Sequence, residues 1–137
     1  MTLHHFGISV AKIETALELY VDRFGYLVQS PIIHDPRQTA FVQFLRLPGD
    51  SAFLELVAPD GPESKLAAAV KQGGGLHHLC YSVSDIESAT QELRSKQMAV
   101  LCEPVPAVAF PGRKIAWLMG RDRLPIELVE GGVPGQL

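Results

Sequence analysis

Two histidine pairs stand at equivalent places in two segments of the chain that resemble each other. Residues 3–10 read LHHFGISV, and residues 76–83 read LHHLCYSV. At an offset of 73 (78 minus 5), residues 3–16 and 76–89 are identical at eight of fourteen positions. Imidazole is a common ligand of divalent transition metals, so a duplicated unit that offers one histidine per copy can assemble a shared metal site.

A glutamate is repeated in the same way near the end of each copy. Glu55 lies in FLELV and Glu127 in PIELV, at an offset of 72 (127 minus 55). Both are flanked by apolar residues, where an unpaired carboxylate is costly. Two imidazoles and two carboxylates form a ligand set that suits Zn²⁺, Co²⁺, Ni²⁺, Mn²⁺ or Fe²⁺, whereas Mg²⁺ and Ca²⁺ favour sites built from oxygen alone.

The elements that would position these residues follow the same order in both copies. In the first copy we expect a strand at 3–10 and three more at 26–34, 39–47 and 52–58. Apolar residues at helical spacing from Ile13 to Phe24, ended by Gly25, predict an amphipathic helix after the first strand. The second copy predicts strands at 76–83, 99–103, 113–119 and 125–130, with a helix at 85–96 capped by Ser84-Asp85.

Each half therefore reads β-α-β-β-β, which predicts an α+β fold made of two such modules, at 1–58 and 76–132. Residues 59–75 join them, with a short helix near 63–71 and three glycines that predict a flexible hinge. Residues 104–112 contain three prolines and predict an ordered surface loop near a ligand cleft. A chain of 137 residues suits one compact domain built from both modules.

The composition of the chain argues against several classes of protein. The net charge of −3 and the lack of a basic stripe argue against a nucleic-acid partner. The chain has no apolar run near the roughly 20 residues of a membrane span, and no signal peptide is expected. Cys80 and Cys102 lie in apolar runs, which predicts free thiols and a cytoplasmic location.

The segments LHHFGISV, FLELVAP, GGGLHHLCYSV and PIELVE resemble the vicinal oxygen chelate superfamily, across residues 3–130. That superfamily includes glyoxalase I, methylmalonyl-CoA epimerase, extradiol dioxygenases, and fosfomycin-resistance and bleomycin-binding proteins. The resemblance implies two βαβββ modules whose mixed sheet forms a cup around a divalent metal ion. It assigns the ligands as His5, Glu55, His78 and Glu127, since the second histidine of each pair matches the ligand position. Strand alternation turns His4 and His77 to the opposite face.

Within the superfamily, the sequences of these segments are most similar to those of the epimerases. This similarity implies a metal-dependent isomerase that abstracts a proton next to a thioester carbonyl. One departure stands at Gln43, where some epimerases carry a glutamate base, because an amide cannot abstract a proton. A ligand carboxylate, Glu55 or Glu127, would then be the base. Gln43 is a candidate substrate contact, and Arg113 and Lys114 are candidates for holding an anionic group of a CoA thioester.

Two alternatives stay open. A lactoylglutathione lyase would share the ligands and differ in its substrate pocket. A non-catalytic member would sequester a small molecule, as drug-binding proteins of the superfamily do. In either case the resemblance implies a small-molecule partner and a homodimer.

Overall fold

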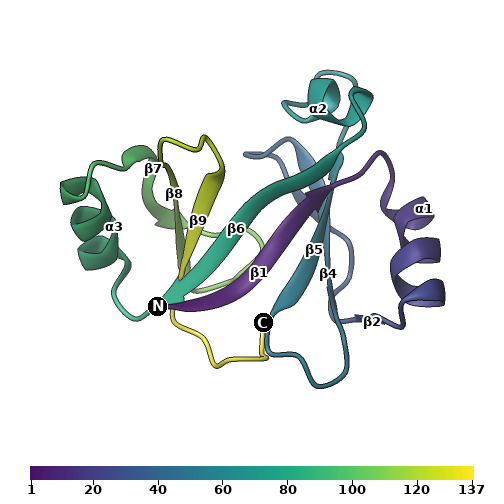
Figure 1. Ribbon diagram of the computed structural model, residues 1–137, viewed down its shortest axis with the longest axis horizontal. Helices are drawn as coiled ribbons and strands as arrows, with labels where there is room; N and C mark the ends of the chain where they lie inside the picture. The colour runs from purple at the N-terminus through teal and green to yellow at the C-terminus, as the bar shows by residue number, and fades with distance from the viewer. The chain divides into compact units, whose positions relative to one another are not determined.

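The computed structural model describes residues 1–137, which form nine strands and few helices (Figure 1). In the first half they are β1 (Thr2–Ser9), α1 (Ile13–Leu17), the π-helical η1 (Glu18–Arg23), β2 (Leu27–Val28), β3 (Ile33–Asp35), β4 (Ala40–Arg46) and β5 (Phe53–Pro59). The second half holds α2 (Ala67–Lys71), β6 (Gly75–Val83), α3 (Ile86–Ser95), β7 (Ala99–Pro106), β8 (Lys114–Met119) and β9 (Pro125–Glu130).

Residue contacts divide the chain into two compact units. The central unit is Phe6–His77, and the terminal unit consists of Met1–His5 together with His78–Leu137. β1 and β6 each contribute residues to both units. The module boundaries expected from the repeat stay a prediction.

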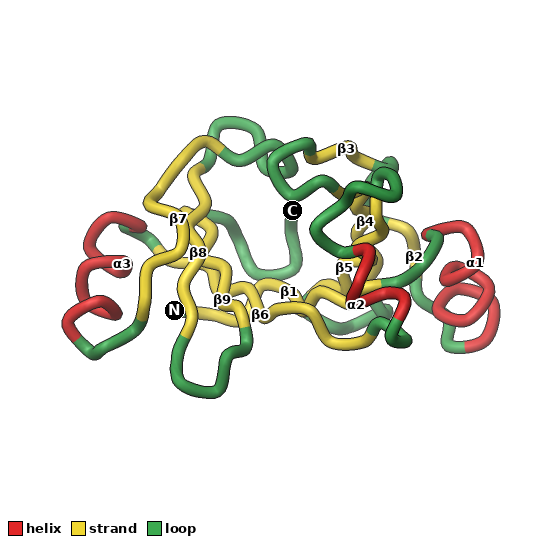
Figure 2. The backbone as a smooth tube through the Cα atoms, turned by 90° about the horizontal axis from the view of Figure 1, so that it is seen from above, coloured by secondary structure: helices red, strands yellow, loops and turns green.

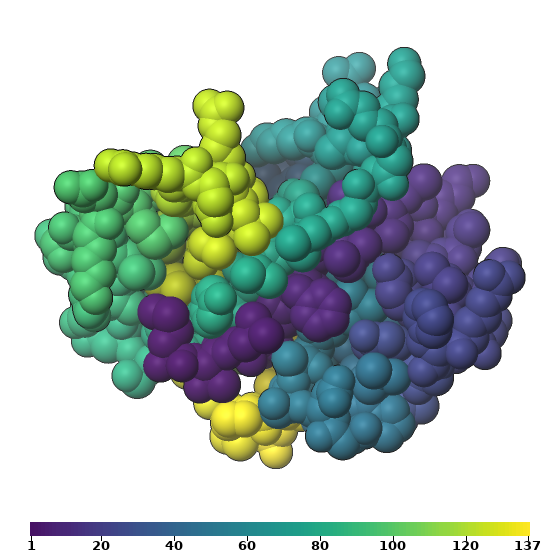
Figure 3. All heavy atoms as spheres, viewed as in Figure 1, coloured from purple at the N-terminus to yellow at the C-terminus, as the bar shows by residue number.

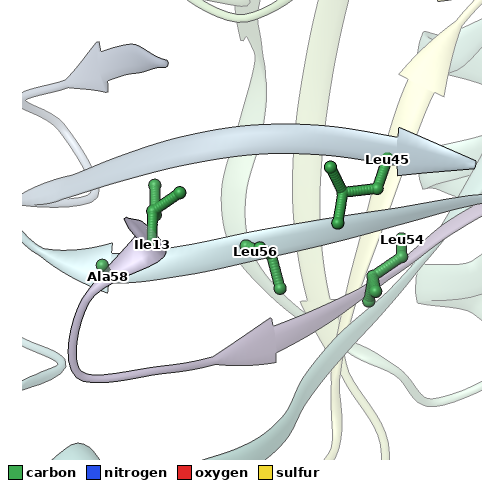
Figure 4. Packing of buried hydrophobic residues seen from close by; sticks show 5 residues of the cluster. All are labelled: Ile13, Leu45, Leu54, Leu56 and Ala58. Atoms are coloured by element: carbon green, nitrogen blue, oxygen red, sulfur yellow. The ribbon is translucent and has the colours of Figure 1, made fainter. Parts of the chain in front are cut away.

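The central unit is built on the antiparallel pairing of β4 with β5, and β4 also pairs with β2 and β3. Helix α1 continues into η1, and its apolar face packs on these strands. Figure 4 shows this core from close by, with Ile13 beside Leu45, Leu54, Leu56 and Ala58 of the strands. Every residue of β5 from Phe53 to Ala58 is buried, although the alternating pattern predicts two distinct faces.

The terminal unit has the strand order β6-β9-β8-β7, in which β6 and β9 run parallel and the other neighbours antiparallel. Helix α3 lies along β7, β8 and β9 in both views (Figures 1 and 2). Its buried side shares a core with the strands, made of Val83, Ile86, Ala116, Leu118 and Leu128. As expected, Asp85 caps this helix, because its side chain accepts the backbone N–H of Ser88.

Two of the differences from the expected element boundaries involve proline. The strand predicted at 26–34 is two short strands, because Ser30-Pro31 interrupts the pairing and Pro31 has no backbone donor. The loop predicted at 104–112 begins later, since β7 continues to Pro106 and pairs Val105 with Ile115. Prolines are tolerated there because β7 lies at the edge of the terminal unit's strand order, where some backbone donors are not needed.

The structure also bears on two expectations from composition. Cys80 and Cys102 are both free, as predicted, with Cys80 buried and Cys102 partly exposed. None of the helices combines the length and the apolar character that crossing a membrane requires.

Candidate metal centre

The side chains of His5, His78 and Glu127 converge in the terminal unit. Nε2 of His5 lies 2.9 Å from Nε2 of His78, and each of these nitrogens lies 3.3 Å from Oε2 of Glu127. The parallel pairing of β6 with β9 places Glu127 opposite Cys80, two residues after His78 on the same face of its strand. Three residues widely separated in the sequence thus meet at one point.

These three side chains are closed off from solvent. His5 and His78 are each 0% exposed and Glu127 is 4% exposed. The chain start that precedes them is at the surface in the space-filling view (Figure 3), and residues 1–3 are exposed. Burial raises the pKa of Glu127, but hydrogen bonds and charge interactions with His5 and His78 outweigh it and hold that pKa below its ordinary value.

The convergent atoms fit a divalent transition metal ion. Ligand atoms that share one ion at bond lengths of about 2.0–2.2 Å lie roughly 2.8–3.6 Å from one another. The three measured separations, 2.9, 3.3 and 3.3 Å, fall in that range. Two imidazole nitrogens and one carboxylate oxygen are also the donor types that such ions take.

Aromatic rings pack against both histidines. The indole of Trp117 meets the His78 ring edge-on, with centroids 4.9 Å apart. Phe110 stacks on His5 at a centroid distance of 6.1 Å and an interplanar angle of 29°. These contacts restrict the rotation of the two imidazoles and keep the site apolar around its polar atoms.

His4 contacts the ring of His5, although strand alternation predicts that the two side chains start from opposite faces of β1. Nδ1 of His4 lies 2.7 Å from Nδ1 of His5, and His4 is only 6% exposed. Phe110 closes over the His4 ring at a centroid distance of 5.2 Å. Strand alternation alone does not capture this contact, because a side chain of this length can reach back toward the ring of the next residue.

Glu55 and Gln43 lie in the central unit, on β5 and β4. Glu55 is 3% exposed and stands opposite Phe44 in the strand register. Nε2 of Gln43 donates to the carbonyl of Ser30 at 3.0 Å, while its buried Oε1 has no hydrogen-bond partner within the chain. Their roles as ligand and substrate contact stay predictions.

Arg113 and Lys114 engage partners within the terminal unit. The Arg113 guanidinium donates to the carbonyls of Glu130 and Gly131 at 2.6 and 2.7 Å, and it lies over the ring of Phe110. Lys114 is ion-paired with Glu87 on α3. Both cations therefore have structural partners, and a role in holding a substrate anion would require these contacts to be shared or exchanged.

Sequence reasoning did not identify Phe110 and Trp117 as parts of the site. Phe110 stands in the proline-rich loop that was expected near a ligand cleft, so position along the chain gave a weak signal for it. Trp117 pairs with Glu127 in the β8–β9 register, so a correct alignment of those two strands would have placed it beside the ligand.

Comparison with known proteins gives the family. The family model described as Glyoxalase/Bleomycin resistance protein/Dioxygenase superfamily matches residues 4–117. The ethylmalonyl-CoA/methylmalonyl-CoA epimerase of Cereibacter sphaeroides is 31% identical over 122 residues, which cover 88% of this chain and 89% of that protein.

Solved structures agree. The methylmalonyl-CoA epimerase of Mycobacterium tuberculosis superposes with a TM-score of 0.83 at 29% identity, covering 96% of this chain and 89% of that one. A variant of the Streptomyces coelicolor methylmalonyl-CoA epimerase, in complex with 2-nitronate-propionyl-CoA, has the same fold, with a TM-score of 0.83 at 23% identity over 97% of this chain and 99% of that one. The expected α+β fold of paired βαβββ modules is thereby confirmed. The chain belongs to the glyoxalase/bleomycin resistance/dioxygenase superfamily, in which it is similar to the methylmalonyl-CoA epimerases.

Proposed function

We propose that this protein is a metal-dependent isomerase that moves a proton on the carbon next to a thioester carbonyl. The observation that carries the proposal is the buried convergence of His5, His78 and Glu127, whose spacing fits one divalent ion. Similarity to methylmalonyl-CoA epimerases supports the reaction class. The cation is Zn²⁺, Co²⁺, Ni²⁺, Mn²⁺ or Fe²⁺, all of which accept this donor set.

In this mechanism His5, His78 and Glu127 hold the ion, and Glu55 is the fourth ligand. When bound, a divalent cation would stabilise the negative charge that develops on the thioester oxygen as the neighbouring carbon loses its proton. A carboxylate of this chain accepts that proton from one face of the carbon, and the same group or a facing group returns a proton; return to the opposite face, which needs a facing donor, inverts the centre. The buried ring of Phe110 and the partly exposed indole of Trp117 pack on the two imidazoles, which would limit the access of water and so protect the carbanion from unproductive protonation.

Glu55 and Glu127 are the two candidates for the proton acceptor. A Glu→Gln change removes the basic carboxylate and keeps an oxygen that can still bind a metal ion. We expect Glu55→Gln to lower the exchange rate at least 100-fold while the metal content is retained. Activity that survives in Glu55→Gln and is lost in Glu127→Gln would assign the proton to Glu127 instead.

The substrate is proposed to be a CoA thioester with a second carbonyl oxygen, as in a 2-alkylmalonyl thioester. The similar Streptomyces coelicolor protein carries 2-nitronate-propionyl-CoA in its solved complex. Two oxygens on such a substrate can occupy the positions that protein ligands leave open on the ion. A homodimer and a cytoplasmic location are part of the proposal and would be measured by sedimentation and cell fractionation.

The experiment that tests the reaction is proton exchange in D₂O. Purified protein loaded with each metal in turn is mixed with methylmalonyl-CoA and ethylmalonyl-CoA, and deuterium at the α-carbon is followed by mass spectrometry. We expect exchange that stops with a chelator and returns with the metal. Metal-loaded protein that exchanges no α-proton in any of several such thioesters would exclude this function.

A second function is favoured by one residue, Gln43, which stands where the resemblance places a carboxylate base. Glyoxalase-type isomerases use a metal-ligating carboxylate for proton transfer and need no base at that position. Turnover of the hemithioacetal of methylglyoxal and glutathione, with no exchange of CoA thioesters, would assign the protein to that class. Binding of less than one metal ion per two chains after reconstitution would instead favour a non-catalytic binding protein.

A further inference from the structure

The contact between His4 and His5 has no part in the proposed reaction. We propose that His4 is a positioning residue that accepts a hydrogen bond from Nδ1–H of His5 and thereby keeps Nε2 of His5 free to bind the metal ion. The inference rests on the metal site of the proposed function. It adds to the site a residue that determines which nitrogen of the His5 imidazole carries the proton.

The two ring nitrogens of His5 face different partners. Nδ1 of His5 lies 2.7 Å from Nδ1 of His4, a hydrogen-bond distance, while its Nε2 faces His78 and Glu127 at 2.9 and 3.3 Å. A neutral imidazole has one proton and one lone pair on nitrogen. If Nδ1 donates to His4, the lone pair is on Nε2, which is the form that a metal ion requires.

The surroundings hold this arrangement in place. His4 and His5 meet nearly edge to face, with ring centroids 5.0 Å apart and an angle of 77°. Phe110 contacts both rings, edge-on to His4 and stacked on His5, and is itself 3% exposed. A hydrogen bond in such an apolar environment is stronger than one in water, and its loss leaves a buried donor with no acceptor.

The second histidine pair is not built the same way. His78 is flanked by the edge of Trp117, and the residue that precedes it, His77, is partly exposed rather than buried. The proposed ligand histidine is thus present in both copies of the repeat, while the side chains that contact it differ between the copies. His77 is therefore a matched control for His4, since it precedes a ligand at the same place in its own copy.

The first test determines directly which ring nitrogen of His5 carries the proton. In ¹⁵N-labelled protein, NMR correlation of the ring nitrogens reports which nitrogen of His5 is protonated, and scalar coupling across an N–H···N bond connects it to Nδ1 of His4. We expect His5 in the Zn²⁺-loaded protein to be protonated on Nδ1 and coupled to His4. Zn²⁺-loaded protein in which His5 Nδ1 carries no proton, or shows no coupling to His4, would overturn the inference.

The second test measures metal affinity with variants. His4→Leu removes the acceptor, and we expect the Zn²⁺ dissociation constant to rise about 10- to 100-fold. In His4→Asn the side-chain oxygen takes the place of Nδ1, so affinity should return to within roughly threefold of wild type. His77→Leu should leave the affinity unchanged. Equal affinity in His4→Leu and wild type, or equal loss in His4→Leu and His4→Asn, would contradict the proposal.

A third arm asks whether His4 is itself a ligand. His4, His5 and Cys80 also offer ligand atoms within 4.8 Å of one another. Direct binding there would give Co²⁺-loaded protein a thiolate charge-transfer band and would make Cys80→Ser lose affinity, and either result would overturn a positioning role. We expect neither.

These outcomes are separable from failure of the proposed function. Wild-type protein that binds none of the five metals would exclude the metal-dependent isomerase, and the positioning role of His4 with it. Wild-type protein that binds metal but shows no proton on His5 Nδ1 coupled to His4 would exclude only the role of His4. Should His4→Leu fail to fold, the tautomer measurement and His4→Asn decide the question.

Discussion

At the scale of single residues, Gln43 stands at a position where the resemblance to epimerases implies a glutamate base. Gln43 is 7% exposed, and one end of its amide is fixed by the carbonyl of Ser30. Its Oε1 is buried without a hydrogen-bond partner in the chain, and such an atom costs free energy unless a ligand supplies a donor. The side chain is therefore well suited to accept a hydrogen bond from substrate, but it cannot act as a base.

Restoring a carboxylate at this position tests that interpretation. We expect Gln43→Glu to raise the rate of α-proton exchange on methylmalonyl-CoA by about 100-fold or more, because a second base becomes available on the other side of the carbon. Exchange is followed in D₂O, with Gln43→Leu as the control for lost hydrogen bonding. A Gln43→Glu protein that binds metal normally and gains no exchange would show that position 43 does not face the reacting carbon.

Thr90 carries another buried polar atom with no partner in the chain. It is 2% exposed on α3, and its Oγ1 makes no hydrogen bond. We expect Thr90→Val to raise the free energy of unfolding by about 1 kcal/mol, since the buried hydroxyl is replaced by a methyl group of similar size. Urea denaturation measures it. Thr90→Ser, which keeps the hydroxyl and loses the methyl, should instead destabilise the protein.

At the scale of elements, the strands that carry ligands are fixed by local features at their ends. Asp85 starts α3, whose packing on β8 and β9 holds Glu127 in register with Trp117. Of the three glycines at 73–75, Gly74 and Gly75 lie close to the end of β1, where Ser9 Oγ donates to the carbonyl of Gly75 at 3.1 Å. The sequence predicts a flexible hinge there, whereas the structure has a specific backbone contact.

The cap at Asp85 should make stability depend on pH. Hydrogen bonds from the backbone and hydroxyl of Ser88 lower the pKa of Asp85 from its usual 3.8. Its stabilisation is therefore complete above the unfolded-state pKa and is lost as the pH falls through the lower folded-state value. Asp85→Asn keeps the cap but does not titrate, so the stability advantage of wild type should shrink below about pH 4. A difference in unfolding free energy that is constant from neutral pH to pH 2 would contradict this.

Gly74 should be irreplaceable for a steric reason. A Cβ at this position would lie 2.3 Å from the carbonyl oxygen of Ser9, and φ is +69°. Gly131 has the same φ of +69° with nothing within 4 Å, so it isolates the backbone cost. We expect Gly131→Ala to lose about 1 kcal/mol and Gly74→Ala clearly more than 2 kcal/mol, by chemical denaturation. Equal losses would mean that the chain relaxes away from Ser9 without cost.

At the scale of the whole molecule, the ligands His5, His78 and Glu127 link the beginning, middle and end of the chain. Burying two imidazoles and a carboxylate costs free energy that their mutual hydrogen bonds offset in part. An ion that binds only the folded arrangement must therefore stabilise the entire fold, because the three ligands are far apart in the unfolded chain.

Metal binding should be visible as global stability. At a free metal concentration 100 times the dissociation constant, we expect unfolding to cost about 2.7 kcal/mol more and the melting temperature to rise by several degrees. Excess chelator should reverse the gain, and the effect should weaken at acidic pH because protons compete with the metal ion for the ligand atoms. Calorimetry of wild type, His78→Ala and His77→Ala measures it. A metal-induced shift that persists in His78→Ala would place the binding site elsewhere.

The amino-acid sequence by itself determined the repeat and predicted the order of its elements and the types of its candidate metal ligands. These follow from periodicity and from residue identity, which are local properties that survive without coordinates. The pairs His5–His78 and Glu55–Glu127 were found by aligning the copies, and the structure brings together His5, His78 and Glu127.

Only the tertiary structure decided which neighbours support each ligand. Three features depend on packing between segments distant in the sequence. His4 contacts His5, Phe110 covers both of these rings, and Trp117 lies beside His78. The break at Ser30-Pro31 and the close approach of Gly74 to Ser9 have the same origin. Such contacts arise when a whole core packs at once, and no local pattern of residue types specifies them.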